Sequence, residues 1–154
     1  MNLKKIYSLK EIQQKMAHYC AYQDRCHFDV EKKLKEFDLI PEAKDHLLLF
    51  LMQHDFLNEA RFAKNFAKGK FSQKQWGKNR IIKELKLRKI NTRLIDIALN
   101  ELDYEDYLKT LEVLYLKKNK EIREPNTYKK RQKIYQYLIY KGFESELILD
   151  IMKV

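Results

Sequence analysis

The fold and the charge of this chain both depend on residues 56–93, which read FLNEARFAKNFAKGKFSQKQWGKNRIIKELKLRKINTR. Between residues 58 and 93 there are 12 Lys and Arg residues but only two Glu residues, a net charge of +10. The whole chain also carries +10, so the remaining residues balance at 20 basic and 20 acidic. The basicity is therefore one local block, and such a block indicates a partner of opposite charge.

The apolar residues of the block repeat at helical spacing. Phe62 and Phe66 are four residues apart, and so are Ile81 and Leu85, so each pair lies on one face of a helix. Glycine and aromatic residues lie between the two patterns and permit a turn or a close approach of helices. The block is thus predicted to form two amphipathic helices with cationic outer faces.

The composition favours helices throughout. The chain has 154 residues, of which 45% are hydrophobic and 35% charged, with only three Gly and two Pro. Few helix breakers and many Leu, Lys and Glu residues favour helix over strand, and the apolar share argues against disorder. This length suits one domain or an array of small repeats.

Nothing in the sequence indicates export or a membrane. The longest apolar run, residues 47–52, is far too short to cross a bilayer, and the start of the chain has no apolar signal core. Two cysteines are too few for a disulfide scaffold. We therefore expect a cytoplasmic protein with reduced cysteines and no membrane partner.

An apolar template recurs after 53 positions. The first copy is Leu85, Ile90, Leu94, Ile95 and Leu99, and the second is Leu138, Phe143, Leu147, Ile148 and Met152. A weaker echo begins at Leu34. The repeat predicts an all-α, elongated and curved array of three tandem three-helix repeats, because such units bury their apolar faces against neighbours. We expect the repeats at residues 1–56, 57–102 and 103–154, with the basic block in the second.

Turn and capping residues locate several helix ends. Ser8 followed by Glu11 forms a capping-box pattern, Pro41 suits the first turn of a helix, and Asn91 can cap another. Gly142 is expected to end a helix. Besides these two helices and the two of the basic block, the pattern predicts helices at about residues 9–24, 29–37, 104–117, 128–140 and 144–152, with a mobile break at 117–126. The helix that starts at Pro41 is expected to carry Leu47, Leu48, Phe50 and Leu51, and the one capped by Asn91 to turn Leu94, Ile95, Ala98 and Leu99 inward.

Residues 56–63 (FLNEARFA) and 77–85 (GKNRIIKEL) together resemble the central motif of the RecX family, whose members modulate the RecA recombinase. Several fixed spacings agree: an acidic-Ala-Arg-Phe-Ala helix start, a downstream Gly, then Arg-Ile and Glu-Leu. Two positions depart from the family pattern. Lys89 stands where the family commonly has a glycine that ends the helix, and residues 25–28 replace its usual Arg-x-Tyr-Ser. The family is likewise built from tandem three-helix units.

The resemblance implies a regulator that binds the RecA–DNA filament, in its helical groove, and inhibits ATP hydrolysis, strand exchange and co-protease activity. The implied partners are the RecA filament and single- and double-stranded DNA, with the regulator acting as a monomer. Two alternatives stay open: a sequence-nonspecific DNA-binding helical module without a recombinase partner, and an adaptor for an acidic protein. No phosphate loop or nucleophile motif is present, so neither an enzyme nor a cofactor is expected.

The cationic faces supply the candidate DNA- or filament-binding residues, since Lys and Arg can neutralise phosphates. The alternative is a solvated helix face, but such a face normally mixes signs. The candidates are Lys64, Lys68, Lys70, Lys74, Trp76, Lys78, Arg80, Lys83 and Lys86. Lys78, Arg80 and Lys83 are expected to face solvent. For Trp76, packing between helices is favoured over stacking on a base.

Two further groups of residues could bind a partner or a metal. A second partner surface is expected at Tyr128, Lys129, Lys130, Arg131 and Lys133, with a helix–helix core as the alternative for the tyrosines of this region. The four possible metal ligands are His18, Cys20, Cys26 and His27. The two cysteines are too far apart in sequence for the usual zinc spacing, so no metal site is expected.

Overall fold

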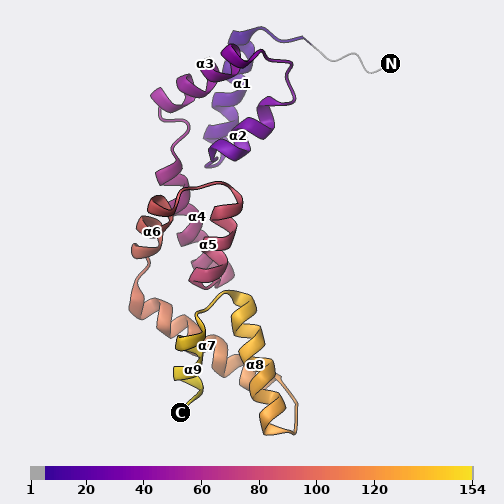
Figure 1. The fold of residues 1–154 in the computed structure, drawn as a ribbon, viewed down its shortest axis with the longest axis vertical. Coiled ribbons are helices and arrows are strands. Elements are labelled where there is room, and N and C mark those ends of the chain that lie inside the picture. The colour runs from indigo at the N-terminus through magenta and orange to yellow at the C-terminus, as the bar shows by residue number, and fades with distance from the viewer. Residues whose placement is uncertain (1–5, 154) are drawn as a thin grey trace, which may run out of the picture.

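The computed structural model describes residues 6–153, and within them all regular structure is α-helical (Figure 1). The helices are α1 (Leu9–Tyr22), α2 (His27–Leu34), α3 (Pro41–Gln53), α4 (Glu59–Lys74), α5 (Lys78–Leu87), α6 (Thr92–Asn100), α7 (Tyr104–Glu121), α8 (Thr127–Lys141) and α9 (Ser145–Met152). The predicted all-α fold is confirmed.

The helices are arranged in three successive groups along one long axis (Figure 1). We call α1–α3 the first unit, α4–α6 the second unit and α7–α9 the third unit. Each unit is built around its own cluster of buried apolar side chains, and Met16, Ile81 and Leu111 are fully buried examples from the three clusters. The chain is therefore an elongated array rather than a body with one central core. The exact repeat boundaries stay predictions.

The recurring template forms the cores of the second and third units. Leu85 and Leu138, which are 53 residues apart, are both fully buried. Three further pairs of the template are also buried: Ile90 and Phe143, Ile95 and Ile148, and Leu99 and Met152. The same apolar spacing thus produces the same helix packing in two units.

Side-chain caps fix where several helices begin. The Ser8 hydroxyl accepts a hydrogen bond from the N–H of Glu11, whose carboxylate reaches back to Ser8, so the predicted capping box is present. The predicted cap at Asn91 is also confirmed, with the Leu94 N–H donating to its side chain. The same kind of cap is made by Asn58, Asp103 and Asn126.

The same backbone turn ends α5 and α8. Gly142 has φ +104°, and the N–H of Phe143 donates to the Leu138 carbonyl. Lys89 has φ +59° and the Ile90 N–H donates to the Leu85 carbonyl in the same way. A helix-ending turn is therefore formed at Lys89 as it is at Gly142, although the left-handed conformation is unfavourable for a residue with a side chain.

The predicted bounds of two helices were wrong. Helix α2 begins two residues earlier than expected and ends at Leu34 rather than near residue 37. Residues 117–121 were expected to belong to a mobile break, but α7 continues through them to Glu121. Four of these five residues are Lys or Glu, which are good helix formers, and Lys118 pairs with Glu121 across one turn at 3.6 Å.

Candidate nucleic-acid interface

The basic block covers α4 and α5 and continues to the start of α6, and most of its cations lack carboxylate partners. Arg61, Lys64 and Arg88 form ion pairs, the last two with Glu101 and Glu84 respectively. Among the residues that the structure describes, the other cations of the block make no ion pair with a carboxylate; they are Lys68, Lys70, Lys74, Lys78, Arg80, Lys83, Lys86, Lys89 and Arg93. The block is thus a region of excess positive charge in the folded protein too.

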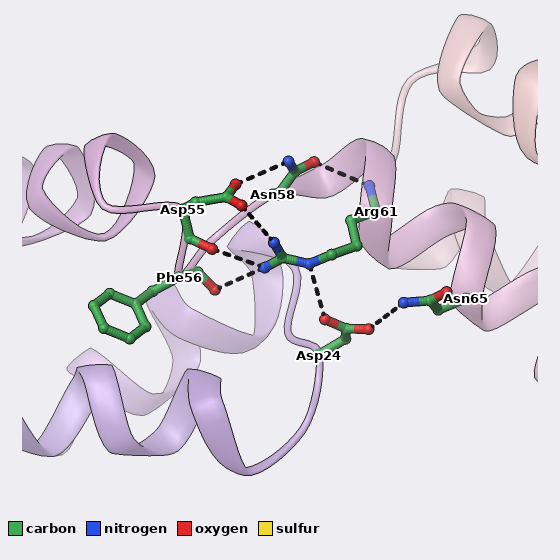
Figure 2. A network of polar contacts seen from close by, with 6 residues as sticks. All are labelled: Asp24, Asp55, Phe56, Asn58, Arg61 and Asn65. Carbon is green, nitrogen blue, oxygen red and sulfur yellow. Dashed lines mark hydrogen bonds and ion pairs between the residues drawn. The ribbon is translucent and has the colours of Figure 1, made fainter.

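Arg61 connects the first and second units instead of contributing to a free surface (Figure 2). Its Nε lies 3.2 Å from Asp24 Oδ1, and its Nη1 lies 2.9 Å from Asp55 Oδ2. Its Nη2 donates to the Asp55 carbonyl at 3.0 Å and to the Phe56 carbonyl at 3.4 Å. Asn65 completes the network by donating to Asp24 at 2.6 Å. The planar guanidinium suits this set of acceptors.

The second and third units meet backbone to backbone. The N–H of Gly77 donates to the Lys141 carbonyl at 2.8 Å, and the N–H of Asn79 donates to the Gly142 carbonyl at 2.8 Å. The first turn of α5 therefore uses its otherwise unpaired N–H groups on the end of α8. Units that share main-chain hydrogen bonds are held in one relative orientation, and this contact is called the joint below.

Tyr107 supports the joint from inside. Its hydroxyl accepts a hydrogen bond from the Lys78 N–H at 2.9 Å and donates one to the Glu144 carboxylate. The ring packs between Phe71 and Phe143, with centroids 5.7 and 5.3 Å away. Burial, followed by the hydrogen bond to Glu144, raises the pKa of the Tyr107 hydroxyl. The Tyr107 hydroxyl thus stays neutral and links Lys78 of α5 to Glu144 in the α8–α9 connection.

Cations and aromatic rings alternate at the joint. The Arg80 guanidinium lies 4.3 Å from the Trp76 ring centroid and 4.8 Å from that of Tyr140. Lys70 lies 5.0 Å from the Trp76 centroid. Trp76 itself is half-buried against the second core and contacts Phe66 edge-on at 6.3 Å. Packing, the favoured interpretation of Trp76, is therefore present, and cation–π contacts are added to it.

The expectation that Lys78, Arg80 and Lys83 all face solvent holds only for Lys83. Lys78 and Arg80 are partly buried, because both pack over aromatic rings that the third unit helps to supply. The exposed members of the candidate set are Lys68, Lys74, Lys83 and Lys86. Four of the candidate cations are thus exposed, while Lys78 and Arg80 also contact the third unit.

Sequence reasoning missed Tyr140 and Lys141, the last two residues of α8. The Lys141 ammonium donates to the main-chain carbonyl of Lys74 at 2.5 Å, across the joint. Burial lowers the pKa of Lys141, and the nearby positive charges of Arg80 and Lys74 lower it further. The sequence signal was slight: both residues immediately precede the helix-ending Gly142.

The predicted second surface on α8 is partly used within the protein. Arg131 donates to the Met152 carbonyl at 2.9 Å, and Lys133 pairs with Glu124 at 3.0 Å. Tyr128 and Lys129 are exposed, and Lys130 is half-buried. The alternative of a helix–helix core applies to other tyrosines of this region: Tyr107 is buried, and Tyr115, Tyr135 and Tyr137 pack against the third core.

The two cysteines are buried in different cores. Cys20 packs in the apolar cluster of the first unit and Cys26 in that of the second unit, and burial raises the pKa of each thiol to about 11. Across residues 6–153, no group of three or more His, Cys, Asp and Glu side chains is placed to hold a metal ion. In the same described part, no helix is both long and apolar enough to cross a membrane.

Comparisons with known proteins agree with the motif resemblance. Residues 58–99 match the family described as "RecX, second three-helix domain", and residues 105–152 match "RecX, third three-helix domain". The chain is 31% identical to the regulatory protein RecX of a Haemophilus influenzae strain over 126 residues. This aligned stretch covers 81% of this chain and 82% of that protein. It is also 32% identical to the regulatory protein RecX of a Clostridium botulinum strain over 122 residues. This second aligned stretch covers 78% of this chain and 56% of that protein.

Two solved structures have the same architecture. A crystal structure of regulatory protein RecX superposes with a TM-score of 0.82 at 26% identity, covering 94% of this chain and 75% of that one. The crystal structure of RecX from Lactobacillus salivarius gives a TM-score of 0.84 at 21% identity and covers 94% of both chains. At 21% identity, the similarity to the Lactobacillus salivarius structure is evidence for the fold alone.

Proposed function

Because this chain belongs to the RecX family, we propose that it binds the RecA–DNA filament and inhibits the recombinase's ATP hydrolysis, strand exchange and co-protease activity. The protein acts through binding and has no chemistry of its own. Its partners are the RecA filament and the single- or double-stranded DNA within it, and its place of action is the cytoplasm. The regulator binds as a monomer.

One observation supports this most strongly: the second unit carries a surplus of cations without carboxylate partners. Lys68 and Lys74 on α4 and Lys83 and Lys86 on α5 are exposed, and no ion pair neutralises them within the described residues. A filament formed on DNA presents phosphates, and each Lys–phosphate contact releases counterions. Exposed and unpaired cations are the groups that gain most from such contacts.

The shape supports a filament partner over a compact one. Three units in a line form an elongated body whose neighbouring units are fixed by the Arg61 network and by the joint (Figure 1). A rigid elongated array can follow a helical groove without losing much conformational freedom on binding. The contacts of Arg61 and Tyr107 therefore support binding by holding the second unit in a fixed orientation between its neighbours.

The test is titration of the protein into a RecA–single-stranded-DNA ATPase assay, with binding to bare DNA measured in parallel. We expect ATP hydrolysis to fall as the protein saturates the filament. An unchanged ATPase rate, together with saturated binding to bare DNA, would instead support the second candidate, a DNA-binding module without a recombinase partner. The unpaired cations alone are compatible with that second candidate.

The adaptor hypothesis makes a different prediction in the same experiment. An adaptor for an acidic protein would bind neither bare DNA nor the DNA of the filament. Binding of DNA that weakens steeply as salt rises would remove this hypothesis, because an adaptor makes no phosphate contacts. Binding to the recombinase in the absence of DNA would support it.

A further inference from the structure

We infer that the joint between the second and third units is a subsite for single-stranded DNA, where Arg80 and Lys141 hold a phosphate and the Tyr140 ring stacks on a base. The inference rests on the proposed function, because it takes DNA to be a partner. It adds two residues of α8, Tyr140 and Lys141, to the candidate interface and gives the joint a role in binding.

The first support is a concentration of positive charge without a counter-ion. Lys141 reaches across the joint to the Lys74 carbonyl at 2.5 Å, and Lys74 and Arg80 are close enough to lower its pKa, after the larger effect of burial. Within residues 6–153, none of these three cations forms an ion pair with a carboxylate. Like charges gathered in a partly buried place raise the free energy of the site, and a bound anion lowers it.

The second support is that the cations are already held in place. The Arg80 guanidinium lies between the Trp76 and Tyr140 rings, at 4.3 and 4.8 Å from their centroids. Gly77 and Gly142 lie against each other with no room for a side chain, and the Arg80 backbone and Cβ lie directly against Gly142. A phosphate therefore meets donors whose side-chain freedom is already restricted, so less entropy is lost on binding.

The aromatic neighbour favours nucleic acid over a small free anion. Tyr140 is 70% exposed although it carries Arg80 against its ring. An exposed ring beside phosphate-binding cations is the arrangement by which proteins bind unpaired strands, with the base stacked on the ring and the backbone on the cations. Bases in a duplex are already stacked and paired, so the Tyr140 ring contributes only when the strand is single.

The experiment uses the full chain and a labelled oligothymidylate, with a duplex of the same length as a second probe. The chain has one Trp, so the emission of Trp76 reports directly on the joint. Two variants test the two halves of the site: Tyr140→Leu removes the ring, and Lys141→Gln removes the charge but keeps a donor for the Lys74 carbonyl. Circular dichroism checks that each variant is folded.

Two matched controls lie in the first unit. Tyr22→Leu changes a ring that is 77% exposed, close to the exposure of Tyr140. Lys32→Gln removes the same charge from an exposed position on α2 that forms no ion pair within the described residues. Neither control residue belongs to the proposed interface, so each control should bind DNA like the unchanged protein.

We expect Tyr140→Leu to weaken oligothymidylate binding by about 5- to 100-fold, the range set by one base–aromatic stack, and to leave duplex binding within about twofold. Lys141→Gln should weaken both probes and flatten the single-strand salt slope by about 0.7. Oligothymidylate should also change the Trp76 emission of the unchanged protein.

Three outcomes overturn the inference, and they separate its failure from that of the proposed function. If the unchanged protein binds DNA but both variants behave like their controls, the subsite is wrong while the proposed function stands. If inorganic phosphate displaces the strand better than sodium chloride of equal ionic strength, and Tyr140→Leu has no effect, the joint holds a free anion instead. If the unchanged protein does not bind DNA at all, the DNA contacts of the proposed function fail as well.

Discussion

Gly77 and Gly142 lie in contact through their backbones, 65 positions apart in the sequence. A Cβ added to Gly77 would lie 2.3 Å from the carbonyl carbon of Gly142, and a Cβ added to Gly142 would lie 2.4 Å from the Cβ of Arg80. Both distances are too short for real atoms. The two hydrogen bonds of the joint, from Gly77 and Asn79 to the end of α8, depend on this close approach.

Gly77→Ala should therefore loosen the joint and destabilise the protein. The new methyl group meets main-chain atoms that cannot rotate away, and overpacking of this kind costs about 1–3 kcal/mol. Gly69→Ala is the matched control: Gly69 lies inside α4 with nothing within 4 Å of the added Cβ, so this change should stabilise by about 0.5–1 kcal/mol. Chemical denaturation measures both. Equal midpoints for the two variants would show that the crossing tolerates a side chain.

Lys89→Gly should stabilise the protein by about 1 kcal/mol, because Lys89 occupies a left-handed conformation that glycine adopts without steric cost. The same substitution three residues earlier, Lys86→Gly, serves as control. It falls inside α5, where glycine should cost about 1 kcal/mol. A lower denaturation midpoint for Lys89→Gly would mean that contacts of the Lys89 side chain stabilise the protein by more than the left-handed backbone conformation destabilises it.

Local patterns were enough to predict the fold. Ser8, Asn91 and Gly142 act within a few residues of themselves, so their capping and turn roles can be predicted from sequence. The 53-residue repeat predicts the buried faces of two units because both copies bury the same positions. The Lys89 turn was not certain from sequence, since tertiary packing of Ile90 imposes a conformation that lysine does not prefer.

Arg61→Lys should weaken the connection between the first and second units. An ammonium group cannot reproduce the four contacts that the guanidinium makes with Asp24, Asp55 and Phe56. The site is partly solvent-exposed, so the expected loss is modest, about 1 kcal/mol. The backbone amides at the start of α4 should also exchange their hydrogens faster in this variant. Arg93→Lys, at an exposed position outside any ion pair of the described chain, should change neither quantity; an equal effect of the two substitutions would contradict the role of Arg61.

The Lys141 ammonium should titrate below the ordinary lysine range, because burial and the charges of Arg80 and Lys74 disfavour its protonated form. Folding therefore lowers this pKa, and the resulting penalty is full below the folded pKa and is lost as pH rises through it toward the unfolded value. Side-chain NMR of labelled lysine measures the titration. Arg80→Gln should move the pKa of Lys141 upward but not restore it fully, since burial is the larger cause. A Lys141 pKa at the ordinary value would show that the joint is open to water.

The candidate interface was less predictable than the fold. Charge counting located the basic block, but it also counted Arg61, whose partners Asp24 and Asp55 lie in the first unit. It missed Lys141 because the carbonyl it binds is 67 positions away, on Lys74. Contacts between units depend on how the repeats stack, and the apolar template of a single repeat contains no information about that orientation.

The proposed function requires that exposed, unpaired cations of the second unit hold the protein on the DNA of a RecA filament. Its most direct test replaces Lys68, Lys83 and Lys86 together by Glu, since all three are exposed, lie outside the joint and form no ion pair within residues 6–153. The control replaces Lys10, Lys32 and Lys35 of the first unit by Glu, which changes the net charge equally.

The measurement is inhibition of the RecA–single-stranded-DNA ATPase over a range of salt concentrations, with duplex DNA binding followed in parallel. We expect the second-unit variant to stay folded but to inhibit only at much higher concentration, while the control inhibits like the unchanged protein. The slope of log affinity for duplex DNA against log salt should flatten by about 0.9 for each phosphate that the variant no longer neutralises. Equal inhibition by both variants, with an unchanged salt slope, would show instead that the basic block is an ordinary solvated surface.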